Sequence, residues 1–144
     1  MSSSIIIGSD HAGFELKEKI RTRLISEGYT VEDAGPFNET SVNYVTYAKK
    51  VALAVSEARF SKGILVCGSG IGMSMAANRF KGVRAALCAD LLSARLSRQH
   101  NNANVLALGG RLIGDVLAFE LVKTFLETRF EQGRHLERIQ SMDC

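Results

Sequence analysis

The sequence predicts an α/β fold in which a five-stranded parallel sheet lies between two layers of helices, within a single domain of residues 1–144. Short apolar runs alternate with longer segments of helical periodicity along the whole chain. Strands separated by helices are joined by right-handed crossovers, which make the sheet parallel and cover both of its faces. No linker, repeat or low-complexity tract interrupts the alternation, so we predict one domain.

Five runs are predicted to be strands. Four of them are dominated by aliphatic residues, as buried parallel strands are, and the second is weaker. Each run ends at, or just before, a glycine or a cysteine. The strands are expected at residues 5–7, 30–34, 63–67, 83–88 and 104–108.

The segments between the strands have helical periodicity. In residues 14–27, Leu16, Ile20 and Leu24 recur every four positions, and Gly28 has the position of a C-terminal cap. The last predicted helix, 115–130, is the longest and is apolar on more than one side. We therefore expect the sheet to cover one apolar side of this helix, and a second subunit could cover another. The remaining helices are expected at 44–59, after the glycine loop to 78, and at 91–99.

Composition excludes several functional classes. The net charge is +3, and no run of five or more Lys or Arg indicates a nucleic-acid-binding arm. No segment approaches the ~20 apolar residues of a membrane span. The first residues lack the basic and apolar regions of a signal peptide. Three cysteines without a CxxC motif argue against a disulfide framework or a zinc knuckle, and indicate a reducing, cytoplasmic location.

Residues at the strand ends are the first candidates for a site, because ligands of such sheets bind outside the carboxyl ends of the strands. The chain has an acid, a histidine, a thiol and an arginine at or just after the ends of predicted strands. A second histidine precedes the fifth strand. We expect them to share one rim of the sheet. They are Asp10, His11, Cys67, Arg111 and His100, with Asp90 after the fourth strand.

A glycine loop follows the third strand, in the order Gly68, Ser69, Gly70, Ile71, Gly72. Its backbone N–H groups can turn toward one point and bind an anion. The loop is not a Walker A motif, because no Lys-Ser or Lys-Thr pair follows it. A tight strand–helix turn is the alternative.

Cys67 immediately precedes this loop. A thiol facing backbone N–H groups at a helix start can act as a thiolate. The alternative is a small apolar residue at the end of a buried strand. We assign Cys88 to the core and expect Cys144 to be a surface thiol.

Asp10 and His11 can face a ligand, although Asp10 could instead cap the first helix. His100 could instead be a cation at a helix C-terminus. Four arginines in the last third of the chain, near His135, favour a small anionic ligand such as phosphate, with a solvated surface as the alternative. They are Arg111, Arg129, Arg134 and Arg138.

Four stretches together resemble the family of type B ribose-5-phosphate isomerases and the related subunits of galactose-6-phosphate isomerase. They occur in the family's order across nearly the whole chain, and only their combination is specific. The stretches are residues 8–14 (GSDHAGF), 67–72 (CGSGIG), 96–101 (LSRQHN) and 133–135 (GRH) with Arg138. The resemblance implies a Rossmann-like three-layer α/β/α sandwich, no metal and no organic cofactor. It also implies a homodimer or dimer of dimers with active sites shared between subunits.

The resemblance also implies an activity. A proton moves between C1 and C2 through an enediolate, which interconverts ribose 5-phosphate and ribulose 5-phosphate. Such a weak carbon acid requires a positioned base and stabilisation of the oxyanion. By resemblance, Cys67 is the base, and His100 and Asp10 help to open the sugar ring. The oxyanion would be held by the Ser69 hydroxyl and by the backbone of Gly68, Gly70, Ile71 and Gly72.

Substrate binding is implied in the same way. Asn101 would orient the sugar hydroxyls, and the phosphate would meet arginines, whose permanently charged fork suits it. Part of that set would come from the partner subunit. The implied phosphate ligands are His11, Arg111, Arg134 and Arg138.

Two positions place the sequence within the family. Some members lack the cysteine and carry a glutamate at the end of the glycine loop, whereas this chain has Cys67 and Met73. Members usually carry Asp-Tyr-Pro before the second helix, whereas this chain has Asn43, Tyr44 and Val45. Tyr44 is retained as a substrate-binding residue, but the charge and the proline are lost. A tetrose or hexose phosphate therefore stays open as the substrate.

Two other classes of function remain as alternatives. A glycine loop with Asp90 about 20 residues further on superficially fits a dinucleotide site. The loop follows the third strand rather than the first, however, and Met73 replaces the required glycine. A non-catalytic subunit of a hetero-oligomeric isomerase is the second alternative. The presence of Cys67, His100 and Asp10 argues against it.

Overall fold

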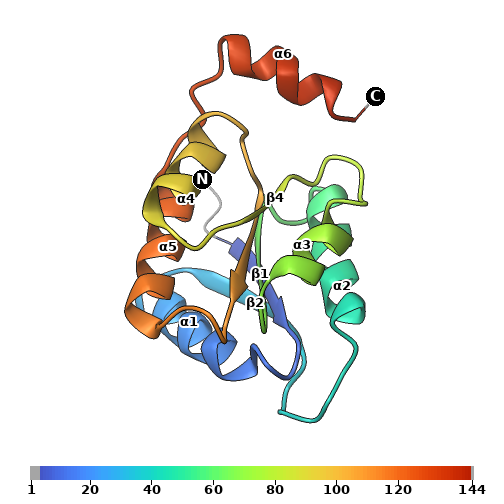
Figure 1. Cartoon of the computed structure of the whole chain (residues 1–144), viewed down its shortest axis with the longest axis vertical. Coiled ribbons are helices and arrows are strands. Elements are labelled where there is room, and N and C mark those ends of the chain that lie inside the picture. Colours follow the sequence, from blue (N-terminus) through green and yellow to red (C-terminus); the bar gives the residue numbers. More distant parts are fainter. Residues whose placement is uncertain (1–3, 144) are drawn as a thin grey trace.

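Five parallel strands form one sheet in the order β2-β1-β3-β5-β4 in the computed structural model, which describes residues 4–143 (Figure 1). Cys144, predicted to be a surface thiol, lies outside the described residues. Consecutive strands alternate with helices, as expected. The strands are β1 (Ser4–Ser9), β2 (Thr30–Gly35), β3 (Lys62–Cys67), β4 (Ala85–Leu87) and β5 (Val105–Gly109). The helices are α1 (Phe14–Ser26), α2 (Tyr44–Ser56), α3 (Ile71–Ala77), α4 (Leu91–Gln99), α5 (Asp115–Glu127) and α6 (Arg134–Ser141).

Helices cover both faces of the sheet and enclose two apolar cores (Figure 1). On one face, α1, α4 and α5 bury a core that includes Ile7, Leu106 and Phe125. On the other face, α2 and α3 bury a core that includes Leu65 and Met73. The predicted α/β sandwich with a five-stranded parallel sheet is therefore confirmed.

The strand order places a reversal of winding between β1 and β3. From β1 the chain moves to one side to form β2, and it then returns past β1 to β3 on the other side. Loops at the carboxyl ends of two such strands diverge and leave a crevice between them. Asp10 and Cys67 lie at the carboxyl ends of these two strands, where ligands of such sheets are expected to bind.

Helix α6 is the one described helix that the sequence pattern did not predict. It lies beyond the amino edge of the sheet, at the top of Figure 1, and Ile139 is its one buried residue. The predicted helix at 115–130 ends earlier, at Glu127, so it is no longer than α1 or α2, each of 13 residues. No described helix is both long enough and apolar enough to cross a bilayer.

Candidate active site

The predicted site residues divide between the two edges of the sheet. Asp10, Cys67 and Arg111 follow β1, β3 and β5 at the carboxyl edge. His100 ends α4, which runs back from β4 to the start of β5, so it lies at the amino edge. The expectation that both histidines share one rim is therefore wrong within one chain, because a crossover helix returns to the opposite edge. At about 3.3 Å per residue, the five residues of β5 separate the edges by roughly 15 Å.

Cys67 is the last residue of β3 and is 5% exposed. Its Sγ accepts a hydrogen bond from the backbone N–H of Gly70, at 3.0 Å. The next amide, that of Ile71, donates to the Ser69 hydroxyl at 3.2 Å. The loop thus folds back on the thiol, and both alternatives for Cys67 hold in part, since the sulfur is buried and also faces a backbone donor.

Two glycines of this loop are required by close contacts. Gly70 has φ +81°, and a Cβ there would lie 2.6 Å from Leu87 Cδ1 and 2.9 Å from the carbonyl carbon of Leu108. A Cβ on Gly72 would lie 2.6 Å from Cε2 of Tyr44 and 2.8 Å from its hydroxyl oxygen. The glycine at 72 therefore admits the tyrosine ring, which brings Tyr44 from the start of α2 to the glycine loop.

Asp10 is 8% exposed and lies in the turn between β1 and α1. Its Oδ1 accepts a hydrogen bond from the N–H of Gly13 at 2.9 Å. Gly13 is itself the N-cap of α1, and no side chain caps this helix, so the alternative that Asp10 caps it is not confirmed. Among the described residues, no donor is in hydrogen-bond range of its Oδ2. One carboxylate oxygen thus fixes the turn, and the other is available to a ligand.

His11 joins the same turn to the segment before α2. Its Nδ1 accepts a hydrogen bond from the N–H of Val42 at 3.2 Å. A neutral imidazole that accepts through Nδ1 carries its proton on Nε2. The geometry therefore assigns to His11 a second nitrogen that can donate a hydrogen bond to an anion.

Arg111 begins the segment after β5, and its side chain is exposed. A Cβ on Gly68 would lie 3.5 Å from both Cδ and Nη1 of Arg111, so the arginine lies against the glycine loop. Two backbone hydrogen bonds join the segment after β5 to the segment after β3. The N–H of Gly110 donates to the carbonyl of Cys67 at 2.7 Å, and the N–H of Arg111 donates to that of Gly68 at 3.0 Å. The guanidinium is thereby held next to the thiol-bearing strand.

Asn43 accepts a hydrogen bond from the N–H of Val45 through Oδ1, at 2.9 Å, and so caps α2. A proline at position 45 would have no N–H to give. This capping bond therefore depends on Val45 having an N–H, whereas the side-chain oxygen of Asn43 accepts it as that of an aspartate would.

The amino edge holds the second group of residues. The rings of His100 and His135 stack with centroids 4.4 Å apart and an angle of 15° between their planes. Glu131 Oε1 lies 3.8 Å from Nε2 of His100 and 3.6 Å from Nε2 of His135. Sequence reasoning missed Glu131, although its spacing of four residues from His135 was a usable signal.

Arg134, Arg138 and Asn101 are exposed at the same edge. Arg134 and Arg138 both lie on α6, one helical turn apart, so their side chains lie on one face of the helix. This face stands at the far end of the sheet from Cys67.

Arg98 fixes the geometry of this edge. It is 7% exposed, and its guanidinium donates to Thr128 O at 3.1 Å, Asn102 Oδ1 at 2.8 Å and Ala103 O at 2.6 Å. These bonds join the end of α4, the turn before β5 and the segment after α5. Burial lowers the pKa of Arg98 below its ordinary value.

The other predicted cysteine assignment is confirmed. Cys88 is 2% exposed in the core between the sheet and α4, and burial raises the pKa of its thiol to about 11. Met73 is fully buried in the opposite core. The position at which a dinucleotide loop needs its third glycine is therefore filled by a core side chain.

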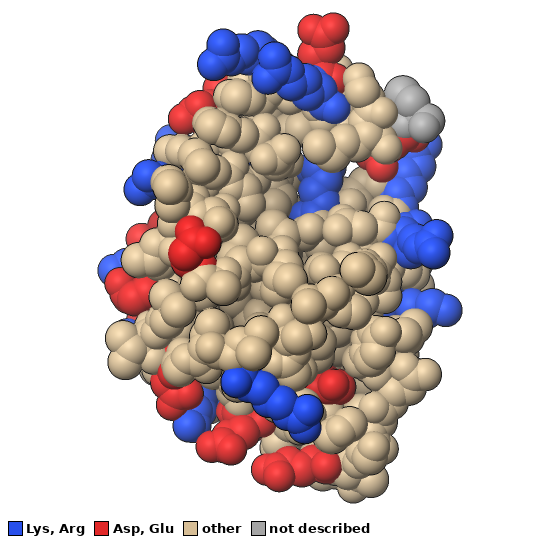
Figure 2. Space-filling view, in the orientation of Figure 1, with Lys and Arg blue, Asp and Glu red and all other residues tan. Residues whose placement is uncertain are grey.

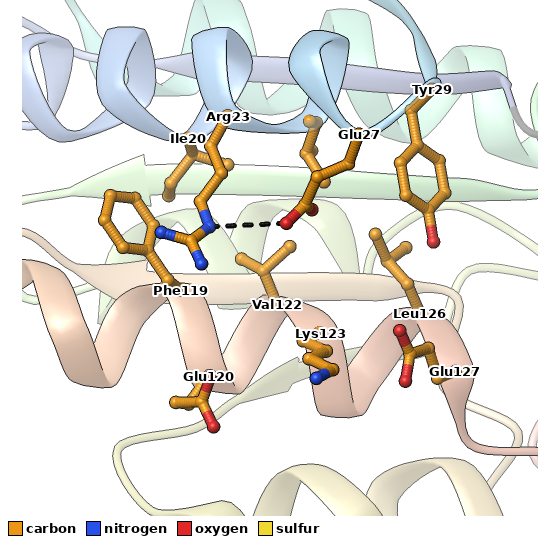
Figure 3. Close-up of a pocket in the computed structure, with 11 residues that line it drawn as sticks. Ile20, Arg23, Glu27, Tyr29, Phe119, Glu120, Val122, Lys123, Leu126 and Glu127 are labelled. Atoms are coloured by element: carbon orange, nitrogen blue, oxygen red, sulfur yellow. Dashed lines mark ion pairs between the residues drawn. The ribbon is translucent and has the colours of Figure 1, made fainter.

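A small cleft of about 30 Å³ lies between α1 and α5, away from both groups (Figure 3). The ion pair of Arg23 with Glu27, at 3.5 Å, runs along the α1 side of the cleft, and the Arg23 guanidinium lies 4.6 Å from the centre of the Phe119 ring on α5. None of the predicted site residues lines this cleft.

The chain is similar to proteins of known activity over nearly its whole length. It is 45% identical to ribose-5-phosphate isomerase B of Escherichia coli over 138 residues, which cover 96% of this chain and 93% of that protein. A solved ribose 5-phosphate isomerase of Thermotoga maritima is 55% identical, with a TM-score of 0.95 over 97% of each chain.

A second solved structure, ribose-5-phosphate isomerase B of Mycoplasma genitalium with bound ribulose-5-phosphate, is 42% identical. It has a TM-score of 0.92 and covers 96% of this chain and 93% of that one. The family described as Ribose/Galactose Isomerase matches residues 5–142. Together with the five-stranded sheet and the loops that flank β1 and β3, these matches establish that the chain belongs to the Ribose/Galactose Isomerase family.

Proposed function

We propose that this chain is an aldose–ketose isomerase that interconverts ribose 5-phosphate and ribulose 5-phosphate. The observation that carries the proposal is the Cys67 thiol at the carboxyl end of β3, with the N–H of Gly70 directed at its sulfur. The similarity to ribose-5-phosphate isomerases B supports the same reaction.

Cys67 is the proposed base. A backbone N–H directed at sulfur complements the negative charge of a thiolate, the form that can accept a proton from carbon. Closing the thiol under the loop also excludes water, which strengthens electrostatic interactions with the substrate. Ser69 and the loop amides are the proposed donors to the oxyanion of the enediolate. Because the amides of Gly70 and Ile71 already have partners, the loop must exchange these bonds for substrate bonds.

The phosphate and the sugar require groups of different kinds. His11 offers an Nε2–H, and Arg111 offers a guanidinium beside Gly68. Tyr44 presents its hydroxyl at the glycine loop, where it can contact sugar hydroxyls. Asn43 is engaged as a helix cap, so we assign substrate selection in this segment to Tyr44.

A shared site between two copies accounts for the groups at the amino edge. In this arrangement, His100, Asn101, Arg134 and Arg138 of one copy complete the carboxyl-edge site of the other. Support comes from the large apolar side chains left exposed on and beside α3, α4 and α5. Figure 2 shows that the face turned to the viewer between α4 and α3 is largely uncharged. The exposed side chains include Ile71 (47%), Met75 (66%), Leu92 (53%), Leu112 (69%) and Val116 (78%).

The deciding experiment measures ketose formation by the purified, metal-free protein on a panel of four-, five- and six-carbon aldose phosphates. We expect the highest kcat/KM on ribose 5-phosphate. Highest turnover on a tetrose or hexose phosphate would keep the chemistry and reassign the substrate. Absence of turnover across the panel would refute the proposal for the chain acting alone and favour a hetero-oligomer.

A further inference from the structure

Two imidazoles and one carboxylate meet at the amino edge of the sheet, where the end of α4 approaches the start of α6 (Figure 1). One ligand atom from each of His100, Glu131 and His135 lies within 4.8 Å of the others. We propose that these three side chains form a binding site for a divalent transition-metal ion such as Zn²⁺.

The two distances from Glu131 to the imidazoles are close to those between ligands of a coordinated metal. Zinc binds imidazole nitrogen at about 2.0–2.1 Å and carboxylate oxygen at about 2.0–2.2 Å, so two ligands of a tetrahedral ion lie roughly 3.4 Å apart. Glu131 Oε1 lies 3.6 Å from His135 Nε2 and 3.8 Å from His100 Nε2. Closing the site around an ion therefore requires movements of only a few tenths of an ångström at these two contacts. The imidazole rings are stacked with an angle of 15° between their planes, so at least one ring must also rotate for both in-plane lone pairs to point at the ion.

The backbone already holds the three residues together. The N–H of Glu131 donates to the carbonyl of Gln99 at 3.0 Å, which fixes the segment before α6 to the end of α4. The N–H of His135 donates to Gln132 O at 3.1 Å. The side chain of His135 is 13% exposed, whereas those of His100 and Glu131 are about half exposed, at 43% and 50%. The open side leaves room for water as a fourth ligand, as in zinc sites with two histidines and a glutamate.

The charges near the cluster set its affinity. Glu131 faces both imidazoles, and a carboxylate in that place attracts a cation and repels phosphate. Arg134 and the amino end of α6 add positive potential and weaken cation binding. Among the described residues, neither imidazole has a hydrogen-bond partner for Nδ1, and such partners raise metal affinity about 10–100-fold. We therefore expect a dissociation constant in the micromolar range.

Bound metal would have a functional consequence. Coordination occupies Nε2 of His100, the residue to which we assign a role in opening the sugar ring. Zinc is thus expected to inhibit the enzyme on cyclic sugar phosphates. This consequence depends on the proposed function, whereas the binding itself does not.

The test is calorimetric titration of ZnCl₂ into the metal-free protein, with Co²⁺ absorption as a second readout. We expect one ion per chain, a micromolar dissociation constant, and a Co²⁺ spectrum without the charge-transfer band of a thiolate ligand. His135→Gln and Glu131→Gln should each weaken binding at least about tenfold. Glu137→Gln, which removes an exposed carboxylate of α6 outside the cluster, is the matched control and should bind as the unaltered chain does.

Two results would overturn the site. One is binding that is equally tight in His135→Gln and Glu131→Gln, which would place the ion elsewhere, for example on cysteine. The other is absence of binding below about 1 mM, a thousandfold above the expected range. Glu131 is exposed, so Glu131→Gln is expected to fold even if His135→Gln does not. Zinc that binds at the cluster without lowering turnover would support the metal site and refute the role of His100.

Discussion

Replacing Gly70 by alanine tests whether the glycine loop is held by contact with β5 as well as by its backbone conformation. Gly70 has φ +81°, and a Cβ on it would lie 2.9 Å from the carbonyl carbon of Leu108 and 3.1 Å from the carbonyl oxygen. Gly82 offers a matched control, because it has φ +79° and no atom within 4 Å of such a Cβ. The two glycines share the conformation and differ in the contact.

The magnitude follows from these two contributions. A residue with a Cβ in the left-handed region costs about 1–2 kcal/mol, and this applies equally to Gly70→Ala and Gly82→Ala. Overlap with a backbone that cannot rotate away adds about 1–3 kcal/mol at position 70 alone. The free energy of unfolding should therefore fall by about 1–2 kcal/mol in Gly82→Ala and by about 2–5 kcal/mol in Gly70→Ala.

The assay is urea unfolding of both variants at one fixed protein concentration, together with isomerase turnover. Gly70→Ala should also lose turnover, because the amide of Gly70 donates to Cys67 Sγ and shifts when the loop moves away from Leu108. Equal losses of unfolding free energy in the two variants would show that contact with β5 contributes nothing, and would refute this reasoning.

Three further predictions concern single side chains. Cys67→Ala should reduce kcat at least about 100-fold while the circular dichroism spectrum is unchanged, because a positioned base contributes about 10²–10⁴-fold. Burial raises the pKa of Cys88 from 9.0 to about 11. Below pH 9, the neutral Cys88 thiol therefore makes its full contribution to the stability of the folded state. This contribution is lost as pH rises toward 11, because the thiol of the unfolded chain has the lower pKa and releases its proton first. Between these two pH values the free energy of unfolding of the unaltered chain falls by on the order of 2 kcal/mol. A plot of unfolding free energy against pH should lack this fall in Cys88→Ala. Arg98→Met should lower the free energy of unfolding by about 2–4 kcal/mol, because one buried and two partly buried acceptors lose their donor.

Each of these has a contrary result. Near-normal turnover of Cys67→Ala would remove the thiol from the mechanism. An unchanged alkaline slope in Cys88→Ala would assign that slope to other groups. A loss below about 0.5 kcal/mol in Arg98→Met would place it with ordinary surface substitutions. Arg98→Lys serves as its control and should not restore stability, because an ammonium cannot reproduce the planar fork.

Most of the fold could be predicted from the sequence because each element repeats its own period. Helix α4 begins and ends at the predicted residues, since Asp90 caps its start and its last apolar residue, Leu96, lies within one turn of its end. Strand β4 is shorter than predicted, at three residues, because a hydrophobic run does not indicate how much of it finds a partner strand. Helix α6 was missed although it is strongly amphipathic, because its eight residues contain only two apolar positions, Leu136 and Ile139, and so short a segment was not predicted to be a helix.

The sequence allowed some of the predicted site residues, but not all of them, to be placed at the correct edge of the sheet. Cys67, Asp10 and Arg111 could be placed at the carboxyl edge, because each follows a strand directly. His100 could not be placed in this way, since its edge depends on the direction in which α4 runs rather than on its neighbours in the sequence. The cap on α2 by Asn43 and the ring of Tyr44 over Gly72 are contacts between side chains and loops, which no sequence period encodes.

The separation of Cys67 and His100 to opposite edges of one sheet has a genetic consequence. If each site joins the carboxyl edge of one copy to the amino edge of another, two different inactive chains can repair one another. A pair formed by one Cys67→Ala chain and one His100→Ala chain contains one doubly altered site and one site with both groups intact. Co-expression of the two variants should then restore isomerase activity that neither has alone, whereas two variants of the same edge should fail to complement.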